Sequence, residues 1–90
     1  MSKNQKKIWI TGASSGIGKA LAHKFSSEGW KVAVSARRKE ILDEMAKNEN
    51  ISSYPLDVTN QDQIKDVFSK IINDFEGLDL CVFSSGTYDP

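Results

Sequence analysis

The chain has 90 residues, of which 39% are hydrophobic and 27% charged, and its twelve basic side chains balance twelve acidic ones. This composition is typical of one small globular domain, and zero net charge argues against a surface for nucleic acid or an anionic membrane. No apolar run approaches the ~20 residues that span a bilayer, and the N-terminus lacks the apolar core of a signal peptide. One cysteine and one histidine provide neither an internal disulfide nor a closed zinc site. We therefore expect a cytoplasmic protein without a bound metal.

Strands and helices alternate in the first half of the chain. Residues 7–11 are a β-branched and aromatic run, which predicts a strand that stops at Gly12. From residue 15 the apolar period becomes that of an amphipathic helix, and Gly29 stands where a left-handed cap ends it. The apolar stripe expected on this helix comprises Ile17, Ala20, Leu21, Lys24 and Phe25. Residues 31–36 then predict a second strand and residues 39–48 a second helix.

The alternation continues in the second half. Residues 51–56 predict a weaker third strand at a sheet edge, because Pro55 near its end cannot donate a backbone hydrogen bond. Thr59 or Asn60 can cap a third helix. The apolar face of that helix comprises Ile64, Val67, Phe68, Ile71, Ile72 and Phe75. Residues 78–83 are almost continuously apolar, which is typical of a strand covered on both faces.

The predicted order β-α-β-α-β-α-β implies right-handed crossovers and a parallel sheet, so the fold class is α/β. We expect the two tryptophans, Trp9 and Trp30, to pack against helices. His23 lies off the apolar stripe of its helix and should face solvent. Cys81 falls inside the last strand, where it should be buried as a small hydrophobic residue.

The segment Thr-Gly-Ala-Ser-Ser-Gly-Ile-Gly, residues 11–18, lies where the first strand meets the first helix. A helix N-terminus places unpaired N–H groups and the positive end of the dipole together, which suits an anion, and glycines let a pyrophosphate approach the backbone. The spacing is not G-x-G-x-x-G. A Walker A loop also fails, because the segment is one residue too long and Ala20 lacks the hydroxyl that would hold Mg²⁺. The alternative is a glycine-rich turn without a ligand.

These eight residues resemble the cofactor-binding signature of the short-chain dehydrogenase/reductase family. The resemblance implies a partial Rossmann-like, doubly wound parallel sheet with strand order 3-2-1-4, and a nicotinamide dinucleotide at the turn. The residues that it assigns to the cofactor are Gly12, Ser14, Ser15, Gly16, Ile17 and Gly18.

The end of the second strand bears on which dinucleotide is bound. A site for NAD places a carboxylate there, about 20 residues after the glycines, to bind the ribose 2′-hydroxyl. Here the strand ends Ser35-Ala36-Arg37-Arg38, and a guanidinium can bind the 2′-phosphate that a carboxylate would repel. We therefore expect NADP(H) rather than NAD(H), with Arg37 as the principal ligand and Ser14, Ser35 or Arg38 assisting. Alternatively, the two arginines are the solvated start of the next helix.

Two further segments match the family in part. Asp57-Val58 resembles an Asp-aliphatic pair whose carboxylate accepts a hydrogen bond from the adenine amino group; alternatively, Asp57 opens a helix-capping turn. Ser84-Ser85-Gly86 stands where the family typically has Asn-Ala-Gly. Gly86 matches, whereas Ser84 lacks the amide side chain, so only a backbone role beside the cofactor ribose carries over to it.

The catalytic motif of the family does not occur in these residues. The family uses a Tyr, a Lys four residues later that lowers the pKa of that Tyr, and a Ser. Tyr54 is followed four positions on by Val58, and only two residues follow Tyr88. The resemblance therefore implies that residues 1–90 are the N-terminal part of a dinucleotide-binding domain without its catalytic and substrate-binding part. No catalytic residue is assigned, and the chain alone should be inactive.

Two functions of different classes follow. The first is the NADP(H)-binding segment of an oxidoreductase that transfers a hydride between nicotinamide and a carbonyl or alcohol substrate. The second is a non-catalytic dinucleotide-binding or sensing module. Substrate binding, and any homo-oligomer, would belong to a full-length form. Without a fifth strand, residues 78–83 should expose an apolar edge, so the isolated chain should be marginally stable or should associate.

Overall fold

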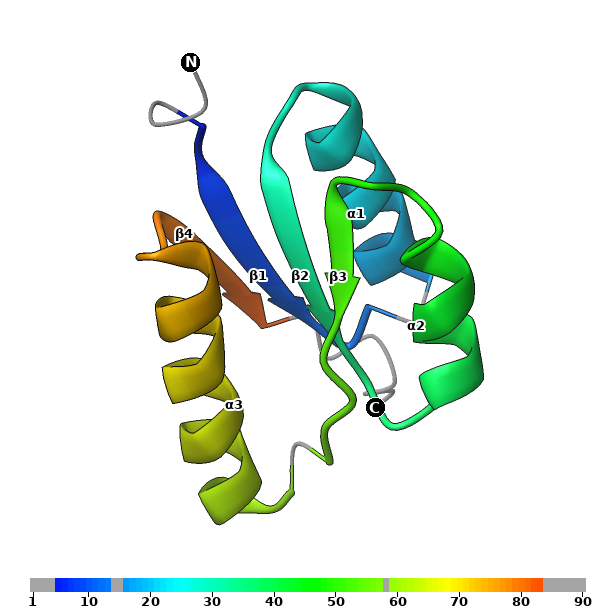
Figure 1. The fold of residues 1–90 in the computed structure, drawn as a ribbon. Helices are drawn as coiled ribbons and strands as arrows, with labels where there is room; N and C mark the ends of the chain where they lie inside the picture. Colours follow the sequence, from blue (N-terminus) through cyan, green and yellow to red (C-terminus); the bar gives the residue numbers. More distant parts are fainter. Residues whose placement is uncertain (1–4, 14–15, 58, 84–90) are drawn as a thin grey trace.

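The computed structural model describes residues 5–13, 16–57 and 59–83. The elements found in these ranges are β1 (Lys7–Thr11), α1 (Gly16–Ser27), β2 (Lys31–Ser35), α2 (Lys39–Met45), β3 (Ile51–Ser53), α3 (Gln61–Phe75) and β4 (Leu80–Phe83) (Figure 1). They confirm the predicted alternation of strands and helices. None of the helices in the described ranges has the length and apolarity that crossing a membrane requires.

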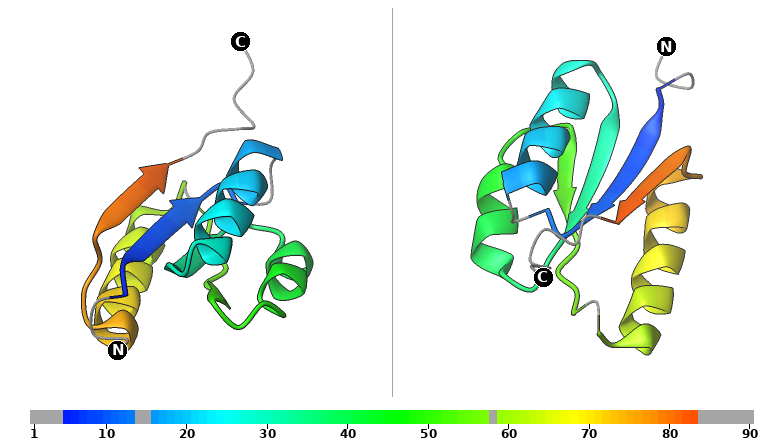
Figure 2. Two further views of the ribbon diagram at one scale, coloured as in Figure 1. Left: turned by 90° about the horizontal axis from the view of Figure 1, so that it is seen from above. Right: turned by 180° about the vertical axis from the view of Figure 1, so that it is seen from behind.

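The four strands form one parallel sheet in the order β3-β2-β1-β4, as predicted. β1 is central, and Ile10 pairs with Val34 of β2 on one side and with Val82 of β4 on the other. Helices α1 and α2 cover one face of the sheet and α3 covers the other, as the two views of Figure 2 show. This arrangement is a partial Rossmann-like fold.

Alternation along the strands divides the core between the two faces. Ile8 and Ile10 of β1 lie with Leu42 of α2 in a buried cluster on the α1/α2 face. Trp9 lies between them in sequence and packs instead with Ile71 of α3 on the other face. Each helix layer therefore contacts its own set of β1 side chains, and the sheet is fixed from both sides.

The face that α1 turns to the sheet differs from the predicted stripe. The buried residues are Gly18, Ala22 and Ser26, whereas Ile17 is 69% exposed. Ala20 and Lys24 are also exposed, and Leu21 and Phe25 are half-buried at the sides of the contact. The physical reason is close packing. A Cβ added at Gly18 would lie 2.5 Å from the carbonyl oxygen of Gly12, so only small residues fit between this helix and the sheet.

Within the described ranges β4 pairs with β1 alone, so it is an edge strand and has the open edge that was predicted. The prediction that both faces of this strand are covered is wrong, because three of its four residues are exposed. Leu80 is 42% and Phe83 67% exposed. Cys81 is exposed as well, contrary to the buried position predicted for it. One helix, α3, covers only part of one face of this strand, and the Phe83 ring packs edge-on against Trp9 with 5.9 Å between ring centroids.

The ends of the helices and strands show which of the predicted caps and boundaries are present. Asn60 is the N-cap of α3, because its side-chain oxygen accepts a hydrogen bond from the Gln63 backbone N–H at 3.1 Å. Gly29 follows α1 with φ +90°, as a left-handed cap requires. At the end of α3 the left-handed residue is Glu76, with φ 62°, although a glycine follows it. Strand β3 is shorter than predicted, and α2 ends at Met45.

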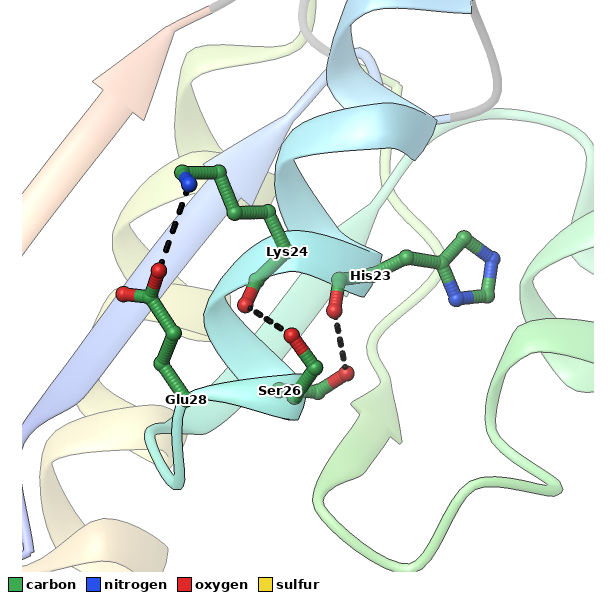
Figure 3. Close-up of polar contacts among 5 residues, drawn as sticks. His23, Lys24, Ser26 and Glu28 are labelled. Atoms are coloured by element: carbon green, nitrogen blue, oxygen red, sulfur yellow. Dashed lines mark hydrogen bonds and ion pairs between the residues drawn. The ribbon is translucent and has the colours of Figure 1, made fainter.

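The C-terminal turn of α1 is held by polar contacts of the helix itself (Figure 3). The Ser26 hydroxyl donates to the carbonyl oxygen of His23 at 3.0 Å, and Lys24 forms an ion pair of 3.2 Å with Glu28. The His23 ring points away from these contacts and the residue is exposed, as predicted. Asn50 attaches the loop before β3 to this turn by donating to the Ser26 carbonyl oxygen at 3.1 Å.

Candidate functional site

The candidate segments follow the carboxyl ends of β1, β2 and β3, which meet at one edge of the parallel sheet. Two backbone hydrogen bonds join these segments. Ala13 N–H in the glycine turn donates to the Ser35 carbonyl oxygen at 3.1 Å, and Leu56 N–H donates to the Ala36 carbonyl oxygen at 3.0 Å. The segment that precedes Arg37 is therefore a direct neighbour of the glycine turn, and the segment that precedes Asp57 is in turn a neighbour of that one. In open α/β sheets, ligands bind outside this edge of the strands.

The glycines of the turn are required for different reasons. Gly12 has φ 69°, a conformation that L side chains rarely adopt. Gly18 packs so closely against Gly12 and Ala13 that a Cβ would meet their backbone at 2.5–2.9 Å. Gly16 has neither constraint, because a Cβ added there would meet nothing within 4 Å. The space over the first residue of α1 is thus open to a group that is not part of the described chain.

The start of α1 suits a negatively charged group. The helix begins at Gly16, and its first turn contains no acidic residue, so the partial positive charge of the N-terminus is not compensated there. Ile17 extends from this turn with 69% of its surface exposed. Ser14 and Ser15, which the sequence also assigns to the cofactor, lie outside the described residues.

Arg37 and Arg38 follow β2, and both are exposed. Arg38 occupies the N-cap position of α2 with extended backbone angles, and its side chain makes no capping hydrogen bond. Its carbonyl oxygen accepts from Leu42 N–H at 3.3 Å. Arg38 therefore starts the helix, as the alternative interpretation proposed. Neither guanidinium is buried, so both remain accessible to a ligand at this edge.

Asp57 is held in a turn before α3. Its Oδ1 atom accepts hydrogen bonds from Thr59, at 2.9 Å from the backbone N–H and at 2.7 Å from the hydroxyl. Its own backbone N–H donates to the Gln63 side chain at 3.0 Å. The hydrogen bonds from Thr59, and to a smaller extent the positive charge of Arg37, hold the pKa of Asp57 below its ordinary value. The capping turn proposed as the alternative is therefore present, and it orients the carboxylate. Val58 lies outside the described residues.

Ser35 has a different role from the one predicted. Ser35 is fully buried, and its hydroxyl accepts a hydrogen bond from Trp9 Nε1 at 2.9 Å. The expectation that Ser35 assists at a phosphate is wrong, because the hydroxyl points into the α3 side of the core. Strand register could have indicated this contact: Trp9 pairs with Ala33, and Ser35 is two residues further along the same face.

Tyr54 is not placed as an acid–base group at this edge. Tyr54 donates a hydrogen bond from its hydroxyl to Asp74 of α3 at 2.8 Å. Burial, together with the negative charge of Asp74, raises the pKa of Tyr54 well above its usual range, so this phenol stays protonated. Tyr88, Ser84 and Gly86 lie outside the described residues.

Comparison with known proteins decides the family. A family model described as short chain dehydrogenase matches residues 6–90. The chain belongs to the short chain dehydrogenase family. The strand order described above agrees with the resemblance seen in residues 11–18.

Curated relatives are 34–40% identical to this chain over the matched region. The 3-oxoacyl-[acyl-carrier-protein] reductase FabG of Thermotoga maritima is 39% identical over an alignment 86 residues long, and the match covers 90% of this chain and 35% of that protein. An uncharacterized oxidoreductase of Staphylococcus haemolyticus is 40% identical over an alignment of the same length, and the match covers 92% of this chain and 37% of that protein. The chain thus spans little more than a third of the length of these relatives.

Solved structures of the family have the same fold over the described region. A short-chain dehydrogenase from Streptomyces avermitilis superimposes with a TM-score of 0.82 at 34% identity, covering 90% of this chain and 30% of the other. ElxO with NADP bound gives a TM-score of 0.81 at 34% identity, covering 89% of this chain and 34% of the other. These similarities confirm the partial Rossmann-like fold.

Proposed function

We propose that this chain binds a nicotinamide dinucleotide across the carboxyl ends of β1, β2 and β3, with NADP(H) preferred over NAD(H). The observation that carries the proposal is the open space over Gly16 at the start of α1, next to a strand end that bears Arg37. A glycine as the first residue of a helix leaves the N-terminal N–H groups accessible to the diphosphate. The residues proposed to contact the cofactor are Gly12, Ser14, Ser15, Gly16, Ile17, Gly18, Arg37, Arg38, Asp57, Val58, Ser84 and Gly86.

The preference for NADP(H) rests on the charge at the end of β2. The segment from Ser35 to Arg38 contains no carboxylate and two guanidiniums, and Arg37 is exposed. A guanidinium binds a 2′-phosphate through paired, charge-assisted hydrogen bonds. The solved structure of the relative ElxO with NADP bound supports the same choice here. Asp57, oriented by Thr59, would accept a hydrogen bond from the adenine amino group.

The activity that fits this site is that of an oxidoreductase acting on a carbonyl or alcohol substrate. When bound, the nicotinamide of the cofactor donates or accepts the hydride. We assign to residues 1–90 the binding and orientation of the dinucleotide alone, as the N-terminal part of a dinucleotide-binding domain, because Tyr-x-x-x-Lys does not occur among them. The names of the relatives, a 3-oxoacyl-[acyl-carrier-protein] reductase and an oxidoreductase, support this class of reaction.

The test is fluorescence titration of the chain with NADPH and with NADH. Arg37→Ala should weaken NADPH binding by about tenfold or more, since a hydrogen bond to a charged group contributes about 1.5–3 kcal/mol. NADH binding should stay unchanged, because NADH lacks the 2′-phosphate. Lys47→Ala is the matched control, since Lys47 is an exposed basic residue beyond the end of α2. Equal binding of both cofactors by wild type and Arg37→Ala would refute the phosphate contact.

A further inference from the structure

A buried hydrogen bond joins the central strand to the end of β2. Trp9 Nε1 donates to the Ser35 hydroxyl at 2.9 Å, and the two residues are 1% and 0% exposed. Side chain–side chain hydrogen bonds are a minority in proteins, and one that is shielded from water is electrostatically stronger than an exposed one. This contact is therefore a specific constraint on where β2 ends.

Ser35 stands between the two parts of the proposed cofactor site. Its carbonyl oxygen accepts from Ala13 N–H of the glycine turn at 3.1 Å, and the carbonyl oxygen of the next residue, Ala36, accepts from Leu56 N–H at 3.0 Å. Arg37 is the residue after Ala36. The side chain of Ser35 is thus the anchor of the last strand residue before the exposed arginine.

Trp9, the other partner, is itself held in a fixed orientation. Its ring centroid lies 6.0 Å from that of Phe68 on α3 and 5.9 Å from that of Phe83 on β4. It also belongs to the buried cluster that contains Ile71 and Phe75 of α3. Because the indole is enclosed from two elements, its N–H group gives the end of β2 a rigid point of attachment.

We propose that Trp9 and Ser35 act as a positioning pair that places Arg37 for the cofactor 2′-phosphate; the inference rests on the proposed function. A charged group discriminates between ligands only if its supporting residues hold it in the productive geometry. The side chain of Arg37 is exposed, so packing does not fix its position, whereas Ser35, two residues earlier, is fully buried. The pair therefore contributes to discrimination between NADPH and NADH, although neither side chain contacts the cofactor.

The test compares Ser35→Ala, Trp9→Phe and the double variant. Each single variant leaves one buried polar group without its partner, which lowers stability, whereas the double variant removes both groups and avoids that penalty. In the double variant we expect the ratio of NADPH to NADH affinity to fall about fivefold, the equivalent of one hydrogen bond. NADH affinity should change little, because the backbone contact from Ala13 to Ser35 does not involve either side chain.

Tyr54→Phe is the control on the same face of the sheet. It removes a side-chain hydrogen bond of similar length, 2.8 Å to Asp74, which is exposed and does not lie at the end of β2. The affinity ratio should therefore stay at the wild-type value in this variant. A ratio that falls equally in Tyr54→Phe and in the double variant would overturn the proposal, since it would show only a general effect of stability.

Two further measurements separate failure of the pair from failure of the proposed function. In an Arg37→Ala background the double substitution should not lower the ratio further. Amide hydrogen exchange of residues 36–38, measured without cofactor, should be faster in the double variant than in Tyr54→Phe. If Arg37→Ala leaves the affinity ratio unchanged, the proposed preference for NADP(H) is wrong. In that case the hydrogen-exchange rates alone test whether the pair fixes residues 36–38. Unchanged exchange, or a wild-type affinity ratio in the double variant, overturns the positioning role.

Discussion

At the scale of single residues, Gly16 and Gly18 show that neighbouring glycines can be required for unrelated reasons. Gly18 is closed in by the backbone of Gly12 and Ala13, whereas the Cβ position of Gly16 is empty to 4 Å. The need for glycine at position 18 comes from the fold, whereas the need for glycine at position 16 is proposed to come from a ligand. Substitution of the two residues by alanine therefore separates folding from binding.

Gly18→Ala should lower the free energy of unfolding by about 1–3 kcal/mol, the cost of overpacking a site where only backbone could move. Gly16→Ala should leave stability within about 0.5 kcal/mol of wild type, as is usual for exposed positions, and should still weaken dinucleotide binding. Chemical denaturation and NADPH titration of both variants check this. Normal NADPH binding by Gly16→Ala would show that the open space is not where the diphosphate lies.

A second residue-scale prediction concerns Asp57 and pH. Because its pKa is lowered in the folded state, its charge stabilises the fold above its unfolded pKa of about 3.9. That contribution is lost as the pH falls through the lower, folded pKa. Asp57→Asn should thus have a lower Tm than wild type at pH 7, and the difference should disappear toward pH 2. Thermal melts across this range test it, with Asp66→Asn on α3 as a reference for the change in net charge.

At the scale of elements, sequence patterns predicted each helix and strand but not each buried face. The period of α1 is visible in the sequence, yet its contact with the sheet runs through Gly18, Ala22 and Ser26. Hydrophobicity alone points to Ile17 and Leu21, since it does not report how closely two backbones approach. The link from Trp9 to Ser35 was missed for a similar reason, because it depends on the register of β1 against β2.

The end of α3 offers an element-scale prediction. Glu76 adopts φ 62° at the C-cap, a conformation that costs a residue with a side chain roughly 1–2 kcal/mol. Glu76→Gly removes this strain but makes the unfolded chain more flexible. We expect a net gain of about 0.5–1 kcal/mol in the free energy of unfolding, measured by urea denaturation. Gly77, with φ +129°, provides the contrast, since Gly77→Ala should destabilise.

At the scale of the whole molecule, the topology followed from the sequence because alternation and the handedness of crossovers leave few arrangements. The resemblance assigned the candidate residues to the ends of three strands, and backbone hydrogen bonds join the segments that follow those strands. The open edge of β4 was also predicted, whereas the exposure of its faces was not, because the apolar run of residues 78–83 is typical of a covered strand. Asp79 N–H faces β1, so the main-chain groups of Leu80 and Val82 face outward by alternation.

This outward edge predicts self-association of the chain. β4 contains no charged residue or proline to prevent edge pairing, and Leu80 is 42% exposed. Sedimentation velocity should show association that increases with protein concentration, and Leu80→Lys should reduce it. Ile17→Lys, which changes an exposed apolar residue of α1, should not. A monomer at every concentration, with all strands protected from amide exchange, would contradict the prediction.

The central position of β1 has a consequence for the order of events during synthesis. A hydrogen bond of 2.9 Å runs from the Lys7 N–H to the Asp79 side chain, 72 positions later. The ribosome must therefore synthesise the chain past Asp79 before β1 can gain its second neighbour, and contacts so distant in sequence form slowly. Until then the nascent polypeptide can pair only β1, β2 and β3, and the Trp9 ring lacks its contact with Phe83 of β4.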